Sequence, residues 1–241
     1  MSDAKDRLII SLDVPSRDSA MRVVESLNGS VRWVKVGSQL FTAEGPKVVA
    51  DLKKAGFNVF LDLKFHDIPN TVASAGRSAV DLGVDLFNVH AMGGSAMMKK
   101  TVEELSSYCE KTRKPKPKII AVTVLTSMNA DDLKEIGFNS QPDEMVLRLA
   151  RLAKESGLNG VVSSPWEVSA IKSAMGEGFL VVTPGVRPSW AVKDDQVRIK
   201  TPAEAIKEGA DMLVVGRPVL KADNPADSAN RIIDEINSAL L

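Results

Sequence analysis

The chain has 241 residues, enough for one large hydrophobic core, and no low-complexity linker divides it. Lysine plus arginine and aspartate plus glutamate number 31 each, so the net charge is zero and a nucleic acid is not the expected partner. The first residues are charged and no apolar run reaches about 18 residues, so we expect neither a signal peptide nor a membrane span. These features predict one soluble, cytoplasmic domain over residues 1–241.

Residues suited to metal or thiol chemistry are scarce. The chain contains one cysteine, Cys109, and two histidines, His66 and His90. A lone cysteine cannot form an internal disulfide, and these three residues do not supply a zinc cluster. We expect Cys109 to be a small buried side chain and the histidines to be hydrogen-bonded supporting residues. Catalysis would then rest mainly on carboxylates, lysines and arginines, without a metal.

Short β-branched runs alternate with segments of helical period along the chain. The first run, residues 7–14, is followed by Ala20, Val24 and Leu27 on one helical face. The further strand candidates are residues 31–37, 58–64, 86–91, 118–125, 160–164, 179–185 and 212–217. Eight apolar strands, each crossing back through a helix with roughly 30 residues per unit, predict a single closed (β/α)8 TIM barrel. The alternative is an open doubly wound sheet, which usually carries a glycine-rich turn that residues 13–16 lack.

The junctions between these elements carry their own signals. A Gly-X-Asp or Gly-X-Asn pattern precedes four strands, beginning at Gly56, Gly83, Gly157 and Gly209, where glycine can adopt the left-handed cap conformation. Residues 164–167 and 201–204 each combine a capping hydroxyl, a proline and a glutamate, the pattern of a helix start. The repeated junctions indicate a repeated βα unit.

Polar side chains gather where the predicted strands end, which is where the loops of such a barrel carry an active site. They are Asp13, Lys35, Asp62, Lys64, His90, Thr126, Ser127, Arg187 and Arg217. Because the carboxyl ends of parallel strands meet at one end of a barrel, we expect these side chains to converge on one mouth.

Three of them are charged although they lie within apolar strands. Asp62 and Lys64 are two residues apart and therefore point to the same face, and Lys35 lies on the neighbouring strand. Buried charges are costly unless paired, so an alternating row of ammonium and carboxylate groups is expected. A lysine kept protonated by carboxylates, with Asp67 on the following loop, is a proton donor. A purely structural ion-pair network is the alternative.

The end of the eighth strand has the features of a phosphate site. Gly216 allows close approach of the backbone to an anion, and Arg217 can bind that anion with two hydrogen bonds. Arg187 lies on the preceding loop, and phosphate sites in this fold are often formed after strands seven and eight. A structural arginine is the alternative interpretation.

The segment Leu61–Thr71, LDLKFHDIPNT, with its DxKxxD core, resembles the catalytic segment of the bacterial orotidine 5'-monophosphate decarboxylase family. The likeness runs from Leu8 to about Ala239. Further motifs similar to the family occur in order at residues 124–127, 183–188, 195–198 and 215–217.

This resemblance implies a cofactor-independent decarboxylation of orotidine 5'-monophosphate to UMP, the last step of de novo UMP biosynthesis, in a homodimer. It implies that Lys64 protonates C6, that Asp62 keeps Lys64 charged, and that Asp67, with Ile68 and Thr71, completes the partner's site. The implied further substrate contacts are Asp13, Lys35, Thr126, Ser127, Pro184, Arg187, Gln196, Gly216 and Arg217.

Other functions share part of this pattern. A wider suprafamily, including 3-keto-L-gulonate 6-phosphate decarboxylase, carries the DxKxxD core together with magnesium. The likeness at Gln196 and at residues 183–188 favours a nucleotide over a sugar phosphate. A non-catalytic nucleotide-binding barrel would not need the lysine–carboxylate row, and a structural barrel in an assembly would not need charges at so many strand ends.

Overall fold

The computed structural model describes residues 3–27, 29–191 and 200–240 and contains a closed barrel of eight parallel strands. The strands are β1 (Leu8–Ser11), β2 (Trp33–Gly37), β3 (Asn58–Phe65), β4 (Leu86–His90), β5 (Lys118–Val122), β6 (Gly160–Val162), β7 (Leu180–Thr183) and β8 (Met212–Val215). Each strand pairs with the next, and β8 pairs with β1 to close the barrel. The (β/α)8 prediction is confirmed, with most strands ending earlier than expected.

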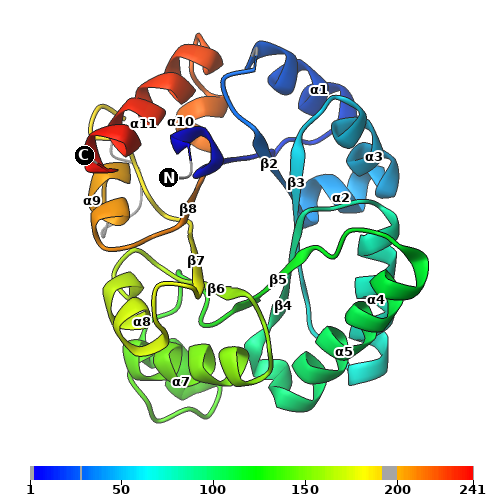
Figure 1. Ribbon diagram of the computed structural model, residues 1–241. Helices are drawn as coiled ribbons and strands as arrows, with labels where there is room; N and C mark the ends of the chain where they lie inside the picture. The colour runs from blue at the N-terminus through cyan, green and yellow to red at the C-terminus, as the bar shows by residue number, and fades with distance from the viewer. Residues whose placement is uncertain (1–2, 28, 192–199, 241) are drawn as a thin grey trace.

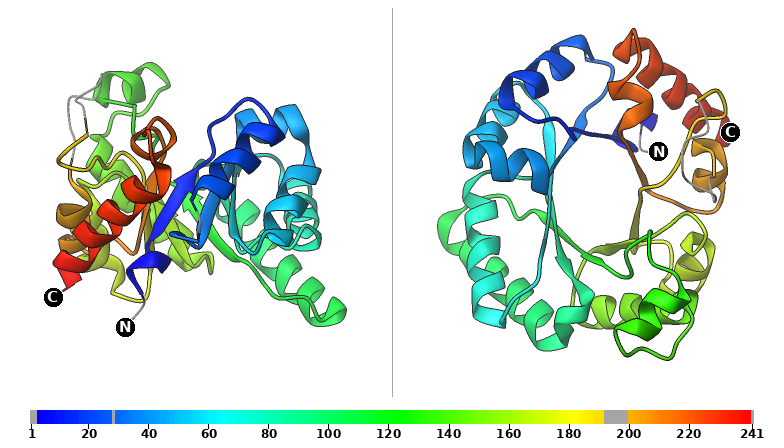
Figure 2. Two further views of the ribbon diagram at one scale, coloured as in Figure 1. Left: turned by 90° about the horizontal axis from the view of Figure 1, so that it is seen from above. Right: turned by 180° about the vertical axis from the view of Figure 1, so that it is seen from behind.

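Helices form an outer ring around the strands (Figure 1). They are η1 (Ala4–Asp6), α1 (Arg17–Ser26), α2 (Ser38–Glu44), α3 (Pro46–Lys54), α4 (Pro69–Asp81), η2 (Ala91–Gly93), α5 (Gly94–Thr112), α6 (Ala130–Glu135), α7 (Pro142–Glu155), α8 (Val168–Met175), α9 (Pro202–Lys207), α10 (Arg217–Leu220) and α11 (Pro225–Leu240). Figure 2 (left) shows α6 at one end of the barrel and the loop joining α5 to β5 at the other. No described helix is long and apolar enough to cross a membrane.

Two layers of apolar side chains surround the sheet. The larger cluster lies between strands and helices, and Cys109 of α5 is buried within it as expected. The smaller cluster fills the barrel and consists of Ile9, Phe60, Leu86, Ile120, Val182, Met212 and Val214. Because side chains alternate along a strand, the residues two positions after Phe60 and Leu86 share this inward direction. Those residues are Asp62 and Asn88, so the polar site is built on the apolar filling of the barrel.

The predicted glycine junctions are confirmed. Gly56, Gly83, Gly157 and Gly209 all have positive φ, between 72° and 103°. At three of these junctions the following acid or amide accepts a hydrogen bond from the preceding strand: Val59 N–H to Asp85 (2.8 Å), Ile119 N–H to Asn159 (2.8 Å) and Val181 N–H to Asp211 (2.7 Å). These bonds join neighbouring strands at the amino-terminal end of the barrel.

One of the two predicted helix starts is wrong. Thr201 caps α9 and forms a capping box with Glu204, as predicted. The helix expected at residues 164–167 begins at Val168 instead. Glu167 N–H donates to the main-chain carbonyl of Ser164, and the Ser164 hydroxyl donates to the Glu167 carboxylate. These bonds close a turn, so the helix starts after it.

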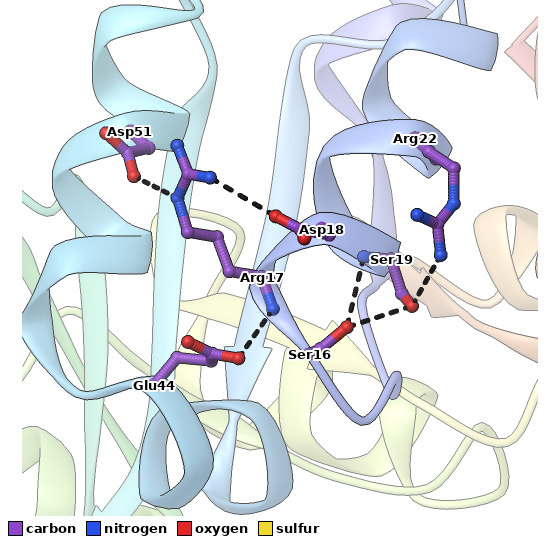
Figure 3. Close-up of polar contacts among 7 residues, drawn as sticks. All are labelled: Ser16, Arg17, Asp18, Ser19, Arg22, Glu44 and Asp51. Carbon is purple, nitrogen blue, oxygen red and sulfur yellow. Dashed lines mark hydrogen bonds and ion pairs between the residues drawn. The ribbon is translucent and has the colours of Figure 1, made fainter.

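The start of α1, which follows the loop after β1, is attached to the second βα unit through Arg17 (Figure 3). Arg17 N–H donates to Glu44 of α2 at 2.9 Å, and its guanidinium Nε donates to Asp51 of α3 at 2.5 Å. This hydrogen bond lowers the pKa of Asp51 below its usual value. The contacts position the loop that carries Asp13 beside the unit that carries Lys35.

Candidate active site

A cavity of about 300 Å³ opens at the carboxyl ends of the strands. Its apolar lining includes Phe60, Val122, Val162 and Val214, and its polar lining consists of Ser11, Asp13, Lys35, Asp62, Lys64 and Thr126. Pro184 and Gly216 complete the wall on the side of β7 and β8. Seven of the predicted site residues, from six different strands or their loops, therefore meet in one cavity.

Four charged side chains in this cavity form a continuous row. Lys35 Nζ lies 3.4 Å from Asp13 Oδ1 and 3.1 Å from Asp62 Oδ2. Asp62 Oδ1 in turn accepts a hydrogen bond of 2.8 Å from Lys64 Nζ. The alternation of carboxylate and ammonium groups expected from the sequence is confirmed, and each charge has an opposite charge beside it.

Asp62 is ionised although it is only 9% exposed. Burial by itself would raise the pKa of this carboxyl group. The positive charges of Lys35 and Lys64, together with hydrogen bonds from Lys64 and Asn88, outweigh burial and lower the pKa below its usual value. The row therefore places a fixed negative charge against two ammonium groups.

The backbone of Lys64 adopts the left-handed conformation, with φ of 52°. This conformation is uncommon for a residue other than glycine and costs about 1 kcal/mol or more. The pairing of β3 with β4 shifts register between Leu61 and Phe65, which is where Lys64 lies. Lys64 N–H donates to the side-chain oxygen of Asn88 at 2.8 Å. The strand is thus bent at the lysine and held there by a side chain of β4.

Three contributors to the site were missed from the sequence. Asn88 donates to Asp62 Oδ1 at 2.7 Å, and Ser11 Oγ donates to Asp13 Oδ2 at 2.8 Å. Gly37 leaves room for Lys35, because an added Cβ would lie 2.9 Å from Nζ. Asn88 and Ser11 could have been found by extending the two-residue period along their strands. The need for glycine at position 37 depends on tertiary geometry.

A basic cavity of about 340 Å³ is lined by residues that follow β7 and β8. Arg187, which is buried, and Arg217 line it together with Trp190 and Lys221. Arg217 is the first residue of the short helix α10, so its strand ends before it, at Val215. The structure brings the two predicted arginines together, and their charge suits an anion such as phosphate. Gln196 lies outside the described residues.

The remaining predicted residues lie at the rim. Asp67 and Thr71 line a third cavity, of about 310 Å³, together with Lys64. Asp67 Oδ1 accepts a hydrogen bond from Ile68 N–H, and within the described part of the chain Asp67 forms no ion pair. Ile68 is 67% exposed. Ser127 is exposed and lies outside these three cavities. Asp67 and Thr71 thus lie near Lys64, but within the described part of the chain neither side chain forms a hydrogen bond or ion pair with the charged row.

The two histidines stack on each other, with ring centroids 5.3 Å apart. Burial, followed by electrostatic repulsion from His66 and Lys64, lowers the pKa of His90 to about 4. His90 Nδ1 accepts a hydrogen bond from Met92 N–H at 3.4 Å. His90 is thus neutral near pH 7 and acts as a hydrogen-bonded supporting residue. Among the described residues, no cluster of three histidine, cysteine or acidic side chains could hold a metal.

Comparison with known proteins places this geometry in a family. A model described as the orotidine 5'-phosphate decarboxylase / HUMPS family matches residues 6–232. The chain belongs to this family. It is 52% identical over 234 residues to the orotidine 5'-phosphate decarboxylase of Geotalea daltonii, covering 97% of each protein. It is 49% identical over 233 residues to that of Geobacter sulfurreducens, again covering 97% of each.

The solved structures agree. The crystal structure of orotidine 5'-phosphate decarboxylase from Lactobacillus acidophilus superposes with a TM-score of 0.86 and 37% sequence identity. The match covers 96% of this chain and all of that one. An uncharacterized conserved protein from Geobacillus kaustophilus superposes with a TM-score of 0.84 and 39% identity, covering 95% of this chain and all of that one. The resemblance inferred from the sequence motifs is confirmed.

Proposed function

We propose that this chain decarboxylates orotidine 5'-monophosphate to UMP and carbon dioxide, the last step of de novo UMP biosynthesis, with residues 1–241 acting as one catalytic domain. Membership of the family and relatives of about 50% identity named for this activity support the reaction. The observation that carries the mechanism is the row of Asp13, Lys35, Asp62 and Lys64 in a cavity next to a basic one.

Lys64 has the central chemical role in this proposal. The bond between C6 and the carboxylate breaks, carbon dioxide leaves, and the electron pair remains at C6. The Lys64 ammonium stabilises that negative charge and then transfers a proton to C6, after which solvent reprotonates the lysine. Enzymes that accelerate reactions by about 10¹⁷-fold lower the barrier by roughly 23 kcal/mol, and preorganised charge supplies much of such an effect.

Asp62 supports Lys64 in two ways. Its low pKa keeps it ionised, so it favours the protonated form of Lys64 at 2.8 Å. It also places negative charge near the departing carboxylate, which destabilises the bound substrate relative to the transition state. Because Lys35 is paired with both Asp13 and Asp62, it fixes the spacing of the two carboxylates. The row itself supplies the stabilisation, and we propose no metal or organic cofactor.

The other predicted residues bind the nucleotide. Asp13 and Lys35 contact the ribose hydroxyls, and Thr126, Ser127 and Pro184 contact the ribose or the pyrimidine. Arg187, Gln196, Gly216 and Arg217 bind the phosphate. Binding energy from a phosphate remote from C6 can be used in the transition state rather than only in affinity.

We further propose that the enzyme is a cytoplasmic homodimer with a site shared across the interface. Asp67, Ile68 and Thr71 would reach the partner's cavity. The exposed side chain of Ile68 and the absence of an ion pair of Asp67 with any described residue support this assignment. An obligatory dimer would lose activity on dilution below its dissociation constant.

The test is turnover of orotidine 5'-monophosphate by protein treated with a chelator, followed through the loss of pyrimidine absorbance. The parent should turn the substrate over, and Lys64→Ala should not. No turnover by the parent would contradict the proposal. In that case magnesium with 3-keto-L-gulonate 6-phosphate tests the metal-dependent alternative, and calorimetry with UMP tests a non-catalytic nucleotide-binding barrel.

A further inference from the structure

One amide group connects Asp62 and Lys64, the last two residues of the charged row. Asn88 lies on β4 and is 1% exposed. Its Nδ2 donates to Asp62 Oδ1 at 2.7 Å, while its Oδ1 accepts from Lys64 N–H at 2.8 Å. The neighbours define the orientation of the amide, because a carboxylate requires a donor and a backbone N–H requires an acceptor.

We propose that Asn88 is a positioning residue for the reaction, holding the Asp62 carboxylate and the left-handed backbone of Lys64 in a fixed relation. The inference rests on the proposed decarboxylase function. Asn88 acts through Asp62 and Lys64, and no contact with substrate is assigned to it.

The backbone of Lys64 requires this support because the strand ladder is interrupted there. Leu61 pairs with Phe87 and Phe65 pairs with Val89, so three residues of β3 lie opposite a single residue of β4, which is Asn88. The side-chain oxygen of Asn88 takes the hydrogen bond that a main-chain carbonyl would take in a regular ladder. A left-handed residue persists where its surroundings hold it. The bond thereby sets the direction from which the lysine enters the cavity.

The Asn88 amide is a neutral hydrogen-bond donor to the Asp62 carboxylate. Its Oδ1 accepts from both Lys64 Nζ and Asn88 Nδ2, and its Oδ2 lies 3.1 Å from Lys35 Nζ. The Asn88 amide stabilises the ionised form of Asp62 without adding a positive charge that would repel the Lys64 ammonium.

The charged and titratable groups around Asp62 come from four strands. Lys35 of β2 and Lys64 of β3 contact it directly, and Asp13, after β1, lies beyond Lys35. On β4 the titratable group is His90, which stacks on His66 and is neutral near pH 7 because its pKa is about 4. The contribution of β4 to the row near neutral pH is therefore the hydrogen bond from Asn88.

Two substitutions separate the two bonds. Asn88→Asp keeps the side-chain shape and the acceptor for Lys64 N–H, but replaces the donor to Asp62 with a second carboxylate. Two carboxylates at such a distance share a proton, so the pair should remain protonated to a higher pH than Asp62 alone. Asn88→Ala removes both bonds.

Asn159→Ala is the matched control. Asn159 Oδ1 accepts from Ile119 N–H at 2.8 Å, the same bond type and length as at Asn88, at the other end of the barrel. This variant reports what the loss of such a bond does to stability alone.

The experiment measures kcat, KM, the pH profile of kcat and the thermal midpoint of the parent and the three variants, with orotidine 5'-monophosphate as substrate. In Asn88→Ala we expect kcat to fall at least about tenfold with KM changed less than about threefold. In Asn88→Asp the acid limb of the pH profile of kcat should shift to higher pH by about one unit or more. Asn159→Ala should lower the thermal midpoint and keep the parent's kcat and acid limb.

The outcomes separate the inference from the function on which it rests. If both Asn88 variants match Asn159→Ala in kcat and acid limb, the role of Asn88 is merely structural and the inference is wrong. An unchanged acid limb in Asn88→Asp also contradicts it. Inactivity of the parent toward the substrate overturns the proposed function together with this inference, whereas an active parent with normally active Asn88 variants overturns the inference alone.

Discussion

The two ends of the barrel both contain buried lysine–aspartate pairs, but these pairs have different surroundings. At the amino-terminal end, Lys172 Nζ bonds to Asp211 at 2.8 Å and to the carbonyls of Phe179 and Glu177 at 3.0 and 3.1 Å. Asp211 also accepts Val181 N–H. Each charge is thus bonded to the main chain as well as to its partner. This arrangement fixes α8 against β7 and β8.

At the carboxyl-terminal end the charges bond mainly to other side chains and face a cavity. The Lys64 side chain is 39% exposed, against 5% for Lys172, and its ion-pair partner Asp62 is shared with Lys35. A charge enclosed by main-chain partners contributes to stability, whereas a charge at a cavity remains accessible to a ligand. We call the amino-terminal end of the barrel its base and the carboxyl-terminal end its mouth. We therefore expect substitutions at the base to alter the free energy of unfolding and substitutions at the mouth to alter catalysis.

The largest of four graded effects is expected at Arg217, the arginine that we propose binds the phosphate. Arg217→Ala should lower kcat/KM by roughly 100-fold, about 3 kcal/mol, because charge-assisted contacts to the remote phosphate are used in the transition state. Steady-state kinetics with orotidine 5'-monophosphate measure the loss of kcat/KM. The comparison variant is Lys221→Ala, because Lys221 lines the same cavity. Orotidine, which lacks the phosphate, should be turned over equally by Arg217→Ala and the parent. If Arg217→Ala and the parent had equal kcat/KM with orotidine 5'-monophosphate, Arg217 would not be a substrate-binding residue.

The next effect concerns a glycine at the base. In Gly209→Ala the new Cβ would lie 3.0 Å from Lys172 Cγ, at a residue with φ of 103°. The strain should lower the free energy of unfolding by about 2 kcal/mol while kcat stays within about twofold of the parent. Urea unfolding and turnover measure the two quantities. A large loss of kcat at unchanged stability would contradict the division between the two ends.

A glycine at the mouth provides the counterpart. In Gly37→Ala the added Cβ would displace Lys35 Nζ, which it would approach to 2.9 Å. Because the ammonium is the flexible end of its side chain, stability should change little, but the spacing from Asp13 and Asp62 should be lost. We expect kcat/KM to fall about tenfold, a change of about 1.4 kcal/mol. An unchanged kcat/KM would show that the position of Lys35 does not matter.

The smallest effect is a pH dependence of stability from His90. Its folded pKa of about 4 lies below the ordinary value of 6.5, so between these pH values the unfolded chain binds a proton that the folded chain does not. The stability contributed by neutral His90 is complete above pH 6.5 and is lost as the pH falls toward 4. Between pH 7 and pH 5 the parent should lose about 1 kcal/mol more than His90→Gln, allowing for partial exposure. Urea unfolding measures both losses, and an equal loss in the parent and in His90→Gln between pH 7 and pH 5 would contradict this prediction.

The sequence predicted the mouth of the barrel better than its base. Asp62 and Lys64 lie two apart on a strand, so the period of the strand places both on one face, and parallel pairing adds Lys35. The pair of Lys172 and Asp211 joins a helix to the residue before β8, 39 positions along the chain, and no local pattern specifies such a contact. The left-handed backbone at Lys64 was not predicted either, because the residue type gives no sign of it.

The same capping pattern had a different outcome at each of its two positions. Thr201 and Glu204 form the expected box. Glu204 N–H donates to the Thr201 hydroxyl, whereas Glu167 N–H donates to the main-chain carbonyl of Ser164. The pattern at Ser164 therefore closes a turn, and the helix begins later. Asn88 was overlooked because an asparagine in an apolar strand has no motif, although its inward direction follows from the same period as that of Leu86.

The most direct test of the division between the two ends compares Lys64→Ala with Lys172→Ala for both single-turnover decarboxylation and urea unfolding. Lys64→Ala should lose roughly 10⁴-fold or more in rate while its unfolding free energy stays within about 1 kcal/mol of the parent. Lys172→Ala should lose about 3–5 kcal/mol in stability, since Asp211 is left without its charge partner, and retain the parent's rate when folded. A Lys64→Ala variant that keeps its rate, or a folded Lys172→Ala variant that loses it, would contradict the assignment of chemistry to the mouth and stability to the base.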